Sequence, residues 1–248
     1  MKSTSSGKVA LVTGASKGIG QAIAERLAAD GMALAIHFGE DESGASATLE
    51  RIEAAGGRGR KFRADISDAA RVKALFDEVV AEFGRLDVVV NNAGIGLPMT
   101  PIAQVSEADF DRVMATNAKG VFLLMREAAN RLGAEGRIIS IATTLTLTGR
   151  PGFGPYAASK AAVEALTRVL ARELGAKRIT VNAVAPGPID TALFRKGKTQ
   201  AQLDASAAFS PMNRVGQPAE VTNVVAFLAS GEASWVTGQV VRANGGWF

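Results

Sequence analysis

The sequence contains no cysteine and only one histidine, His37. Without cysteine the chain cannot form disulfides, use a thiolate as a nucleophile or build a zinc site with sulfur ligands. A single histidine excludes multi-histidine metal centres and leaves one candidate base for a serine hydrolase. We therefore expect no metal site, whereas redox chemistry with an organic cofactor remains open.

Long apolar runs are also missing. No run approaches the 18 or so residues that a membrane-spanning helix requires, and residues 1–7 are short and polar without a signal-peptide core. We expect a soluble, cytoplasmic protein that binds no membrane. The formal net charge of +4 suits a phosphate-bearing ligand. The basic residues are scattered rather than gathered into runs, which argues against a nucleic-acid partner.

Short β-branched runs alternate with longer segments of helical periodicity, which is typical of βαβ units in a parallel sheet. Right-handed crossovers between such strands place helices on both faces, so we predict a doubly wound α/β sheet of about seven strands, with ligands at the carboxyl ends of the strands. The expected strands are 9–13, 33–38, 58–63, 86–91, 137–142, 179–185 and 239–243, and the expected helices include 18–30, 43–55, 68–83 and a long helix within 106–132.

No linker, low-complexity tract or repeat divides the chain, so we expect one domain over residues 1–248. The only long irregular stretch is residues 186–214, with a short helix expected near 200–208. A loop of that length inside a compact domain is usually functional, often as a lid.

A glycine-rich turn, TGASKGIG at residues 13–20, follows the first expected strand. Its glycines permit close approach of the backbone to a pyrophosphate, and the helix that begins there offers free N–H groups to anionic oxygen. Alone, such a turn could merely connect a strand to a helix. Two further patterns follow it in order, NNAG at residues 91–94 and YAASK at residues 156–160.

Tyr156 is the only tyrosine of the chain, and it stands four residues before Lys160. On a helix this spacing puts both side chains on one face. A phenol with a pKa of about 10 needs a neighbouring cation to work near neutrality, and an ammonium at ~4 Å would lower that pKa by roughly three. Taken alone, the pair could equally be an aromatic at a helix start and a solvated lysine.

Together the three patterns resemble the TGxxxGxG, NNAG and YxxxK motifs of the short-chain dehydrogenase/reductase family, and the resemblance extends from about residue 7 to residue 246. It implies a Rossmann-fold oxidoreductase that transfers hydride between a nicotinamide cofactor and a carbonyl or secondary alcohol. The implied catalytic residues are Tyr156, Lys160, Thr143 and Asn117. The implied cofactor-binding residues are Gly14, Ser16, Lys17, Gly18, Ile19, Gly20, Phe38, Asp65, Ile66, Asn92, Gly94, Tyr156, Lys160, Pro186, Gly187, Ile189 and Thr191.

One catalytic position departs from the family pattern. The family has a serine thirteen residues before the tyrosine, and here that position is Thr143. Threonine keeps the hydroxyl but adds a methyl group and a stiff χ1 angle. Thr144 is a fallback donor, whereas the odd spacing of Ser140 should point it to the opposite face of its strand. Asn117 resembles a family asparagine whose distorted helix holds a water in a proton relay to the lysine, although it could also be an ordinary polar helix residue.

The choice of cofactor depends on the end of the second strand, where NAD-preferring relatives carry an acid. Here that position holds Phe38, and Lys17 in the turn suits a 2′-phosphate, so NADP(H) is favoured. NAD(H) stays possible because the acids of residues 40–42 follow at once. We expect His37 to lie near the adenosine rather than to act in catalysis.

Several apolar residues in the expected loops indicate an apolar ketone or secondary alcohol as the small-molecule substrate. These are Leu145, Leu147, Phe153, Leu193, Phe194 and Met212. Similar sequences include 3-oxoacyl-acyl-carrier-protein reductases and broad-range ketone reductases. The rival hypothesis is a cofactor-binding regulator or scaffold without turnover, for which Thr143 is the only support. The resemblance also implies a homotetramer or homodimer. Because exposure of the terminal Trp247 and Phe248 would be costly, we expect them to be buried at a subunit interface or against a neighbour's pocket.

Overall fold

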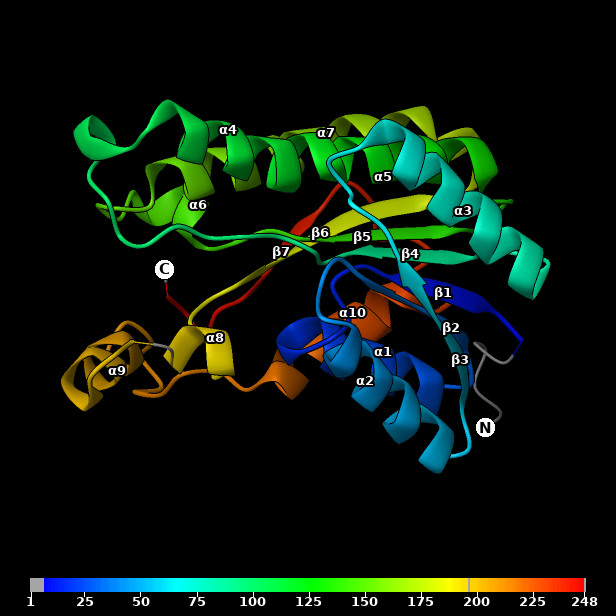
Figure 1. The fold of residues 1–248 in the computed structure, drawn as a ribbon, viewed down its shortest axis with the longest axis horizontal. Coiled ribbons are helices and arrows are strands. Elements are labelled where there is room, and N and C mark those ends of the chain that lie inside the picture. The colour runs from blue at the N-terminus through cyan, green and yellow to red at the C-terminus, as the bar shows by residue number, and fades with distance from the viewer. Residues whose placement is uncertain (1–6, 196, 248) are drawn as a thin grey trace.

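A single seven-stranded sheet organises the computed structural model, which describes residues 7–195 and 197–247 but not the side chain of Leu193. All strand pairs are parallel, in the order β3-β2-β1-β4-β5-β6-β7. The predicted doubly wound α/β fold is confirmed (Figure 1). The strands are β1 (Val9–Val12), β2 (Ala33–Phe38), β3 (Arg58–Arg63), β4 (Val88–Asn91), β5 (Arg137–Ile141), β6 (Thr180–Pro186) and β7 (Val240–Ala243).

Helices cover both faces of the sheet (Figure 1). One apolar core packs under α3, α5 and α7, and a second under α1, α2 and α10. The α-helices are α1 (Gly18–Ala29), α2 (Glu42–Ala54), α3 (Ala69–Phe83), α4 (Glu107–Met114), α5 (Gly120–Arg131), α6 (Leu145–Thr148), α7 (Gly154–Glu173), α8 (Ala192–Arg195), α9 (Gln200–Ala207) and α10 (Pro218–Ala229). Short η1 (Ile102–Gln104) and η3 (Gly175–Lys177) are 3₁₀ turns, and η2 (Ala115–Lys119) is a π-helix.

The central strands are buried on both faces because helices cover both. All residues of β1, β4, β5 and β6 are buried, as expected for strands inside a doubly covered parallel sheet. The edge strand β3 instead alternates exposed basic residues with partly buried ones. Among the described residues, no helix combines the length and the apolar character needed to cross a bilayer.

The structure corrects three sequence expectations about helices. The long helix expected within 106–132 is α4 and α5 joined through the π-helical turn η2. The stretch 186–214 holds the expected helix, α9, but also α8, which was not predicted. A further unpredicted helix, α6, follows β5. Both α6 and α8 have four residues, too few for a periodic pattern to be recognised. In Figure 1 they lie at the end of the sheet where the strands finish.

Candidate active site

The glycine-rich turn leads into α1, whose N-terminus is open to an anion. The N-cap residue Lys17 makes no side-chain capping bond, and the first turn carries no acid. Gly18 has φ +58°, and a Cβ built there would meet nothing closer than the Thr191 methyl group at 3.6 Å. The free N–H groups of an uncapped helix N-terminus bind phosphate well. These residues therefore fit the pyrophosphate of a dinucleotide.

Side chains from two neighbouring strands fix the shape of this turn. Asn92 Nδ2 donates to the carbonyls of Thr13 at 2.9 Å and Gly14 at 3.0 Å. The Thr13 hydroxyl accepts from the backbone N–H groups of Asn92 and Ala93, at 3.0 and 3.1 Å. The role of Thr13 was not predicted from the sequence, although it is the first residue of the glycine-rich pattern. Asn92 thus joins the turn to the end of β4.

His37 holds the same turn from the other side. Its Nδ1 accepts from the Gly14 N–H at 3.2 Å, and its Nε2 lies 3.1 Å from the Ala64 carbonyl. Because both ring nitrogens are occupied and the side chain is buried, the histidine is a structural connection and not a proton-transfer group. Burial lowers the pKa of His37 to about 4, and the Ala64 carbonyl opposes this effect only in part.

Acid should destabilise the fold through His37. We expect the free energy of unfolding to fall by up to about 3 kcal/mol between pH 6.5 and about 4. The unfolded chain takes up the proton near pH 6.5, whereas the folded chain does so only near pH 4, so acid in this window favours unfolding. Urea unfolding at a series of pH values measures the effect.

The matched control is His37→Gln, because glutamine offers one acceptor and one donor but does not titrate. Carboxylates also titrate in this window. The contribution of His37 is therefore the difference between the wild type and the variant in how the free energy of unfolding changes with pH. If the variant loses stability over the same range by the same amount, His37 is not the group responsible.

At the end of β2 the structure limits the predicted role of Phe38. Its ring is only 4% exposed and packs in the core under α1 and α2, so only its backbone can face a ribose. Asp41 caps α2, where it accepts from the Gly44 N–H, and its Oδ2 lies 3.0 Å from Lys17 Nζ. The hydrogen bond from Lys17 lowers the pKa of Asp41. Glu42 pairs with a lysine of β3, so two of the three nearby acids already have partners.

Tyr156 and Lys160 lie on the first two turns of α7, as predicted. Lys160 is 3% exposed, and its Nζ donates to the Ile141 carbonyl at the end of β5 at 2.7 Å. The ammonium lies 6.0 Å from the centroid of the Tyr156 ring. Burial lowers the pKa of Lys160 to about 8. The predicted pair thus meets at the carboxyl end of a central strand.

The expected direction of the Tyr156 pKa was wrong for this structure. Burial raises the pKa of the phenol, and a hydrogen bond with the Thr143 hydroxyl lowers it only in part. The prediction from sequence placed an ammonium at ~4 Å from the phenol, whereas Lys160 Nζ lies 6.0 Å from the ring centroid and donates to a backbone carbonyl. At neutral pH the phenol therefore keeps its proton.

Thr143 is the hydroxyl that faces Tyr156, and the fallback residue does not. The hydroxyl of Thr144 is fully buried and donates to the Ala185 carbonyl at 3.3 Å, so it points at β6. Ser140 accepts from Asn91 Nδ2 at 3.0 Å inside the sheet. The site is therefore built around Thr143, the position that departs from the family pattern.

Asn117 sits in the π-helical turn η2, so the helix distortion expected around it is present. Its side chain accepts from the Ile95 N–H and donates to the Ile95 carbonyl, both at 2.8 Å. A Cβ built on Gly94 would lie 3.1 Å from Asn117 Oδ1 and 3.5 Å from Lys160 Nζ. π-Turns inside α-helices often mark functional positions. Here the turn brings Asn117 and Lys160 to the same glycine of the NNAG segment.

The remaining predicted positions line the same edge of the sheet. Asp65 Oδ1 accepts from the N–H and the hydroxyl of Ser67, at 2.9 and 2.8 Å, and Asp68 caps α3. Ile66 is buried and packs against Gly120 of α5. Asp65 therefore does not cap α3 and stays at the end of β3, where the cofactor site is predicted.

After β6 the chain is held by backbone contacts. Pro186 ends the strand, and the Gly187 N–H donates to the Ala243 carbonyl at 3.1 Å. Ile189 forms a parallel bridge with Gly216. The Thr191 hydroxyl accepts from the Phe194 N–H at 3.1 Å and so opens α8. This loop brings Thr191 opposite the glycine-rich turn.

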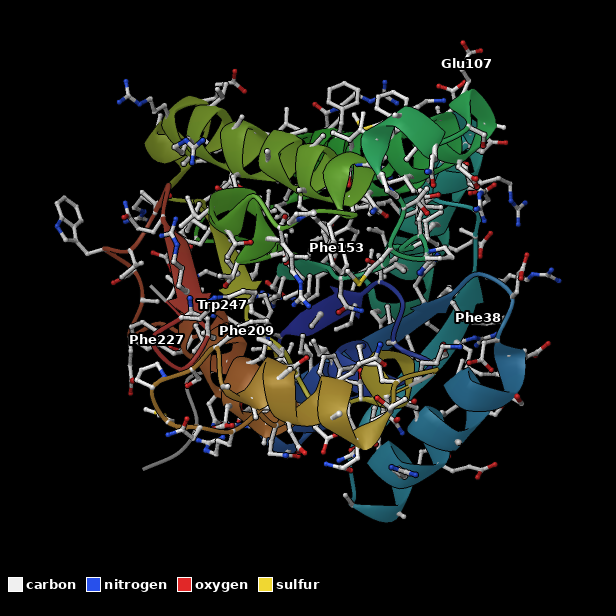
Figure 2. All side chains as sticks on the ribbon, turned by 90° about the vertical axis from the view of Figure 1, so that its left-hand side faces the viewer. Phe38, Glu107, Phe153, Phe209, Phe227 and Trp247 are labelled. Atoms are coloured by element: carbon white, nitrogen blue, oxygen red, sulfur yellow. The ribbon has the colours of Figure 1, made fainter. Side chains whose placement is uncertain are left out.

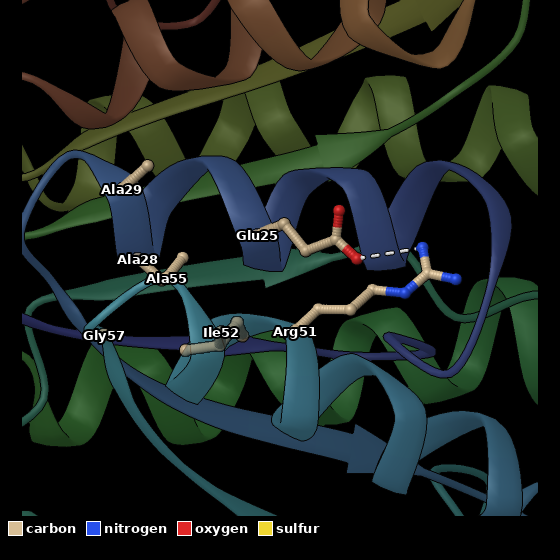
Figure 3. Close-up of a pocket in the computed structure, with 7 residues that line it drawn as sticks. All are labelled: Glu25, Ala28, Ala29, Arg51, Ile52, Ala55 and Gly57. Carbon is tan, nitrogen blue, oxygen red and sulfur yellow. Dashed lines mark hydrogen bonds and ion pairs between the residues drawn. The ribbon is translucent and has the colours of Figure 1, made fainter.

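A separate hollow of about 150 Å³ lies between α1 and α2 (Figure 3). Its walls are mostly alanine and aliphatic side chains, and Glu25 and Arg51 pair across it at 3.5 Å. Because these two charges satisfy each other, we assign no ligand to it. Residues 7–195 and 197–247 contain no group of three or more acidic or histidine side chains able to hold a metal ion.

Comparisons with known proteins agree with this geometry. A family profile described as enoyl-(acyl carrier protein) reductase matches residues 14–248. A "short-chain type dehydrogenase/reductase" of Picea abies is 44% identical, covering 97% of this chain and 92% of the relative. An "NADPH-dependent aldehyde reductase-like protein, chloroplastic" of Arabidopsis thaliana is 43% identical, covering 97% and 94%. The crystal structure of angucycline C-6 ketoreductase LanV with bound NADP superposes with a TM-score of 0.92 at 38% identity, covering 98% and 96%.

Proposed function

The chain belongs to the short-chain dehydrogenase/reductase family, and we propose that it is an NADPH-dependent reductase of an apolar ketone or 3-oxoacyl compound. The observation that carries this proposal is the meeting of the Thr143 hydroxyl, the Tyr156 phenol and the Lys160 ammonium at one strand end. NADPH in the name of the Arabidopsis relative and NADP in the ketoreductase structure support the cofactor. NADH is the weaker alternative.

The cofactor would lie along the carboxyl edge of the sheet. The turn from Gly14 to Gly20 and the open end of α1 would hold the pyrophosphate, and Asp65 with Ile66 would border the adenine. Ile189 and Thr191 would contact the nicotinamide, and Lys160 the nicotinamide ribose. When bound, NADPH supplies the hydride.

The protein residues supply the proton and position the carbonyl. Tyr156 donates its phenolic proton to the carbonyl oxygen, and the raised pKa of the phenol suits this direction of reaction because the proton is present at neutral pH. Thr143 donates a second hydrogen bond to the same oxygen. The Lys160 ammonium lies 6.0 Å from the centroid of the phenol ring. Asn117 is a positioning residue, because its two hydrogen bonds to Ile95 fix the backbone that follows the NNAG segment.

The first test follows absorbance at 340 nm while the purified protein meets NADPH or NADH and a panel of apolar ketones. Oxidation of NADPH supports the reductase. If both cofactors bind but neither is consumed, the regulator or scaffold hypothesis takes its place. The hydrogen bond between Thr143 and Tyr156 weighs against that rival, because the threonine was its only support.

Lys17 should select the cofactor. In Lys17→Ala we expect the KM for NADPH to rise about tenfold and the KM for NADH to change less than twofold, because a charge-assisted contact to the 2′-phosphate is lost. The Lys17 side chain is 70% exposed and its only carboxylate partner among the described residues is Asp41, so it can turn to a phosphate. Steady-state kinetics with each cofactor measure the effect.

Lys73→Ala is the matched control for this change, because Lys73 is an equally exposed lysine paired with an aspartate on α3. It should leave both KM values unchanged. A rise of equal size for NADPH and NADH in Lys17→Ala would show that the lysine does not read the 2′-phosphate.

We also propose that the chain is one domain whose residues 186–214 act as a lid, in the cytoplasm, and that it assembles as a homotetramer or homodimer. A groove of about 490 Å³ between the start of α4 and α7, lined in part by Ile102 and Phe110, supports assembly through these helices. Phe122 on α5 and Val169 on α7 are also exposed. The expected interface at the C-terminus involves Trp247 and Phe248, of which Phe248 lies outside the described residues. Sedimentation showing only monomer would remove this proposal.

A further inference from the structure

A row of rings and one guanidinium joins three distant segments at the carboxyl edge of the sheet. Arg150 lies between α6 and α7, with its Cζ 5.7 Å from the ring centroid of Phe153 and 4.7 Å from that of Phe209. The Phe209 ring also stacks on that of Trp247, with 4.7 Å between the centroids and 10° between the planes. Figure 2 looks onto this edge of the sheet. It shows Phe209 and Trp247 side by side, with Phe153 above them in the view.

The ring contacts of Arg150 leave its hydrogen-bond donors unused. Its Cζ lies over the Phe153 and Phe209 rings, and contact with a ring face occupies none of the five N–H groups, which suit a bidentate acceptor. Yet within 7–195 and 197–247 the Arg150 side chain makes neither an ion pair nor a hydrogen bond. Other arginines of this edge do have acids, as Arg195 has Asp190 and Arg214 has Glu220.

A second cation lies close by without a carboxylate. Lys198, between α8 and α9, donates to the Phe194 carbonyl and lies 3.9 Å from the centroid of the Phe194 ring. In the described part of the chain it has no ion pair. Burial lowers the pKa of Lys198, and repulsion from Arg150 lowers it further. Two like charges close together repel each other unless an anion joins them.

We propose that Arg150 and Lys198 bind a carboxylate carried by the substrate, so that the substrate class is an apolar carbonyl compound with an acidic group. The inference rests on the proposed reductase function and makes its substrate class more specific. Arg150 stands six residues before Tyr156, and Phe153 is the N-cap of the same helix. Leu147 and Met212, which are near Arg150 and Phe209 in the chain, and Met99, which lies beside Gly152, are all more than half exposed and offer the apolar surface.

The cofactor does not account for this pair of cations. Its phosphates fit the open N-terminus of α1, which begins after β1. Arg150 follows β5 and Lys198 follows β6, on the side of the sheet where the carbonyl must meet Tyr156. The anion bound there therefore belongs to the second ligand.

The test compares 6-acetyl-2-naphthoate with its neutral isostere 6-acetyl-2-naphthamide, by titration calorimetry on the full chain with NADP⁺ present and by NADPH-dependent turnover. We expect the carboxylate to bind at least tenfold more tightly than the amide. Arg150→Gln and Lys198→Gln should each reduce the acid-to-amide affinity ratio at least threefold while changing the Kd of the amide less than twofold. Arg58→Gln is the matched control, because Arg58 stacks on Phe83 at 5.4 Å at the opposite end of the sheet.

Three outcomes would overturn the inference. The first is equal affinity for the acid and the amide in the wild-type protein. The second is an equal loss of affinity for both ligands in Arg150→Gln, which would make the arginine a purely structural contact of the lid. The third is an acid-to-amide affinity ratio that is unchanged in both variants. Absence of turnover with tight, arginine-dependent binding of the acid would contradict the reductase proposal and leave the anion site standing. Calorimetry thus distinguishes a failure of the anion-site inference from a failure of the reductase proposal.

Discussion

Replacing Tyr156 by phenylalanine is expected to lower kcat by about 10³-fold, because in the proposed mechanism this phenol delivers the proton to the reacting oxygen. Thr143 can still donate a hydrogen bond, but a threonine hydroxyl is far too weak an acid to give up its proton. The ring and its packing at the start of α7 are kept, so binding should persist. The measurements are kcat at 340 nm and the Kd of NADPH from cofactor fluorescence.

The melting temperature and the Kd of NADPH are the controls for this variant, and both should stay close to wild type. The Tyr156 hydroxyl bonds only with Thr143 among the described side chains, so its removal breaks one hydrogen bond. A variant that kept more than a tenth of the wild-type kcat would show that another group supplies the proton. A variant that had lost NADPH binding would instead indicate a structural role.

Replacing Gly20 by alanine should abolish cofactor binding, with the Kd of NADPH raised at least about 100-fold, and lower the unfolding free energy by roughly 3 kcal/mol. A Cβ there would lie 2.2 Å from the Gly14 carbonyl oxygen and 2.3 Å from Asn92 Nδ2. Neither atom can yield without breaking the bond by which Asn92 holds the turn. Thermal unfolding and fluorescence titration measure the two effects.

Gly133→Ala is the matched control, since its Cβ would meet nothing within 4 Å and its backbone is not left-handed. That variant should bind NADPH as the wild type does and unfold at the same temperature. If Gly20→Ala also binds normally, the start of α1 adapts more freely than its contacts indicate, and the turn is not the fixed element described above.

The repeating pattern of strands and helices was predictable because it depends on hydrophobic periodicity alone. The bounds expected for β2 and β3 agree with the structure, since both are flanked by clear turn residues. The short α6 and α8 and the π-turn at Asn117 were not predicted as such from periodicity, because four or five residues carry no period. The π-turn was expected only through the family resemblance.

The residues brought together at the site were largely predictable, but their pairings were not. Motif order placed Tyr156 and Lys160 at one edge of the predicted sheet, and the family resemblance added Asn117. The sequence does not specify that Lys160 donates to a backbone carbonyl or that Lys17 pairs with Asp41, because both depend on side-chain rotamers. The unused donors of Arg150 are likewise visible only once three distant segments are in place.

The protein's own side chains hold the shape of the glycine-rich turn. Asn92 and Thr13 hold it from β4, and His37 holds it from β2. Little backbone entropy then remains to be lost when phosphate groups settle on it, so more of the interaction free energy appears as affinity. The free and loaded turns should therefore superpose within about 1 Å, as in other preorganised sites, while any induced movement is confined to the α8–α9 segment.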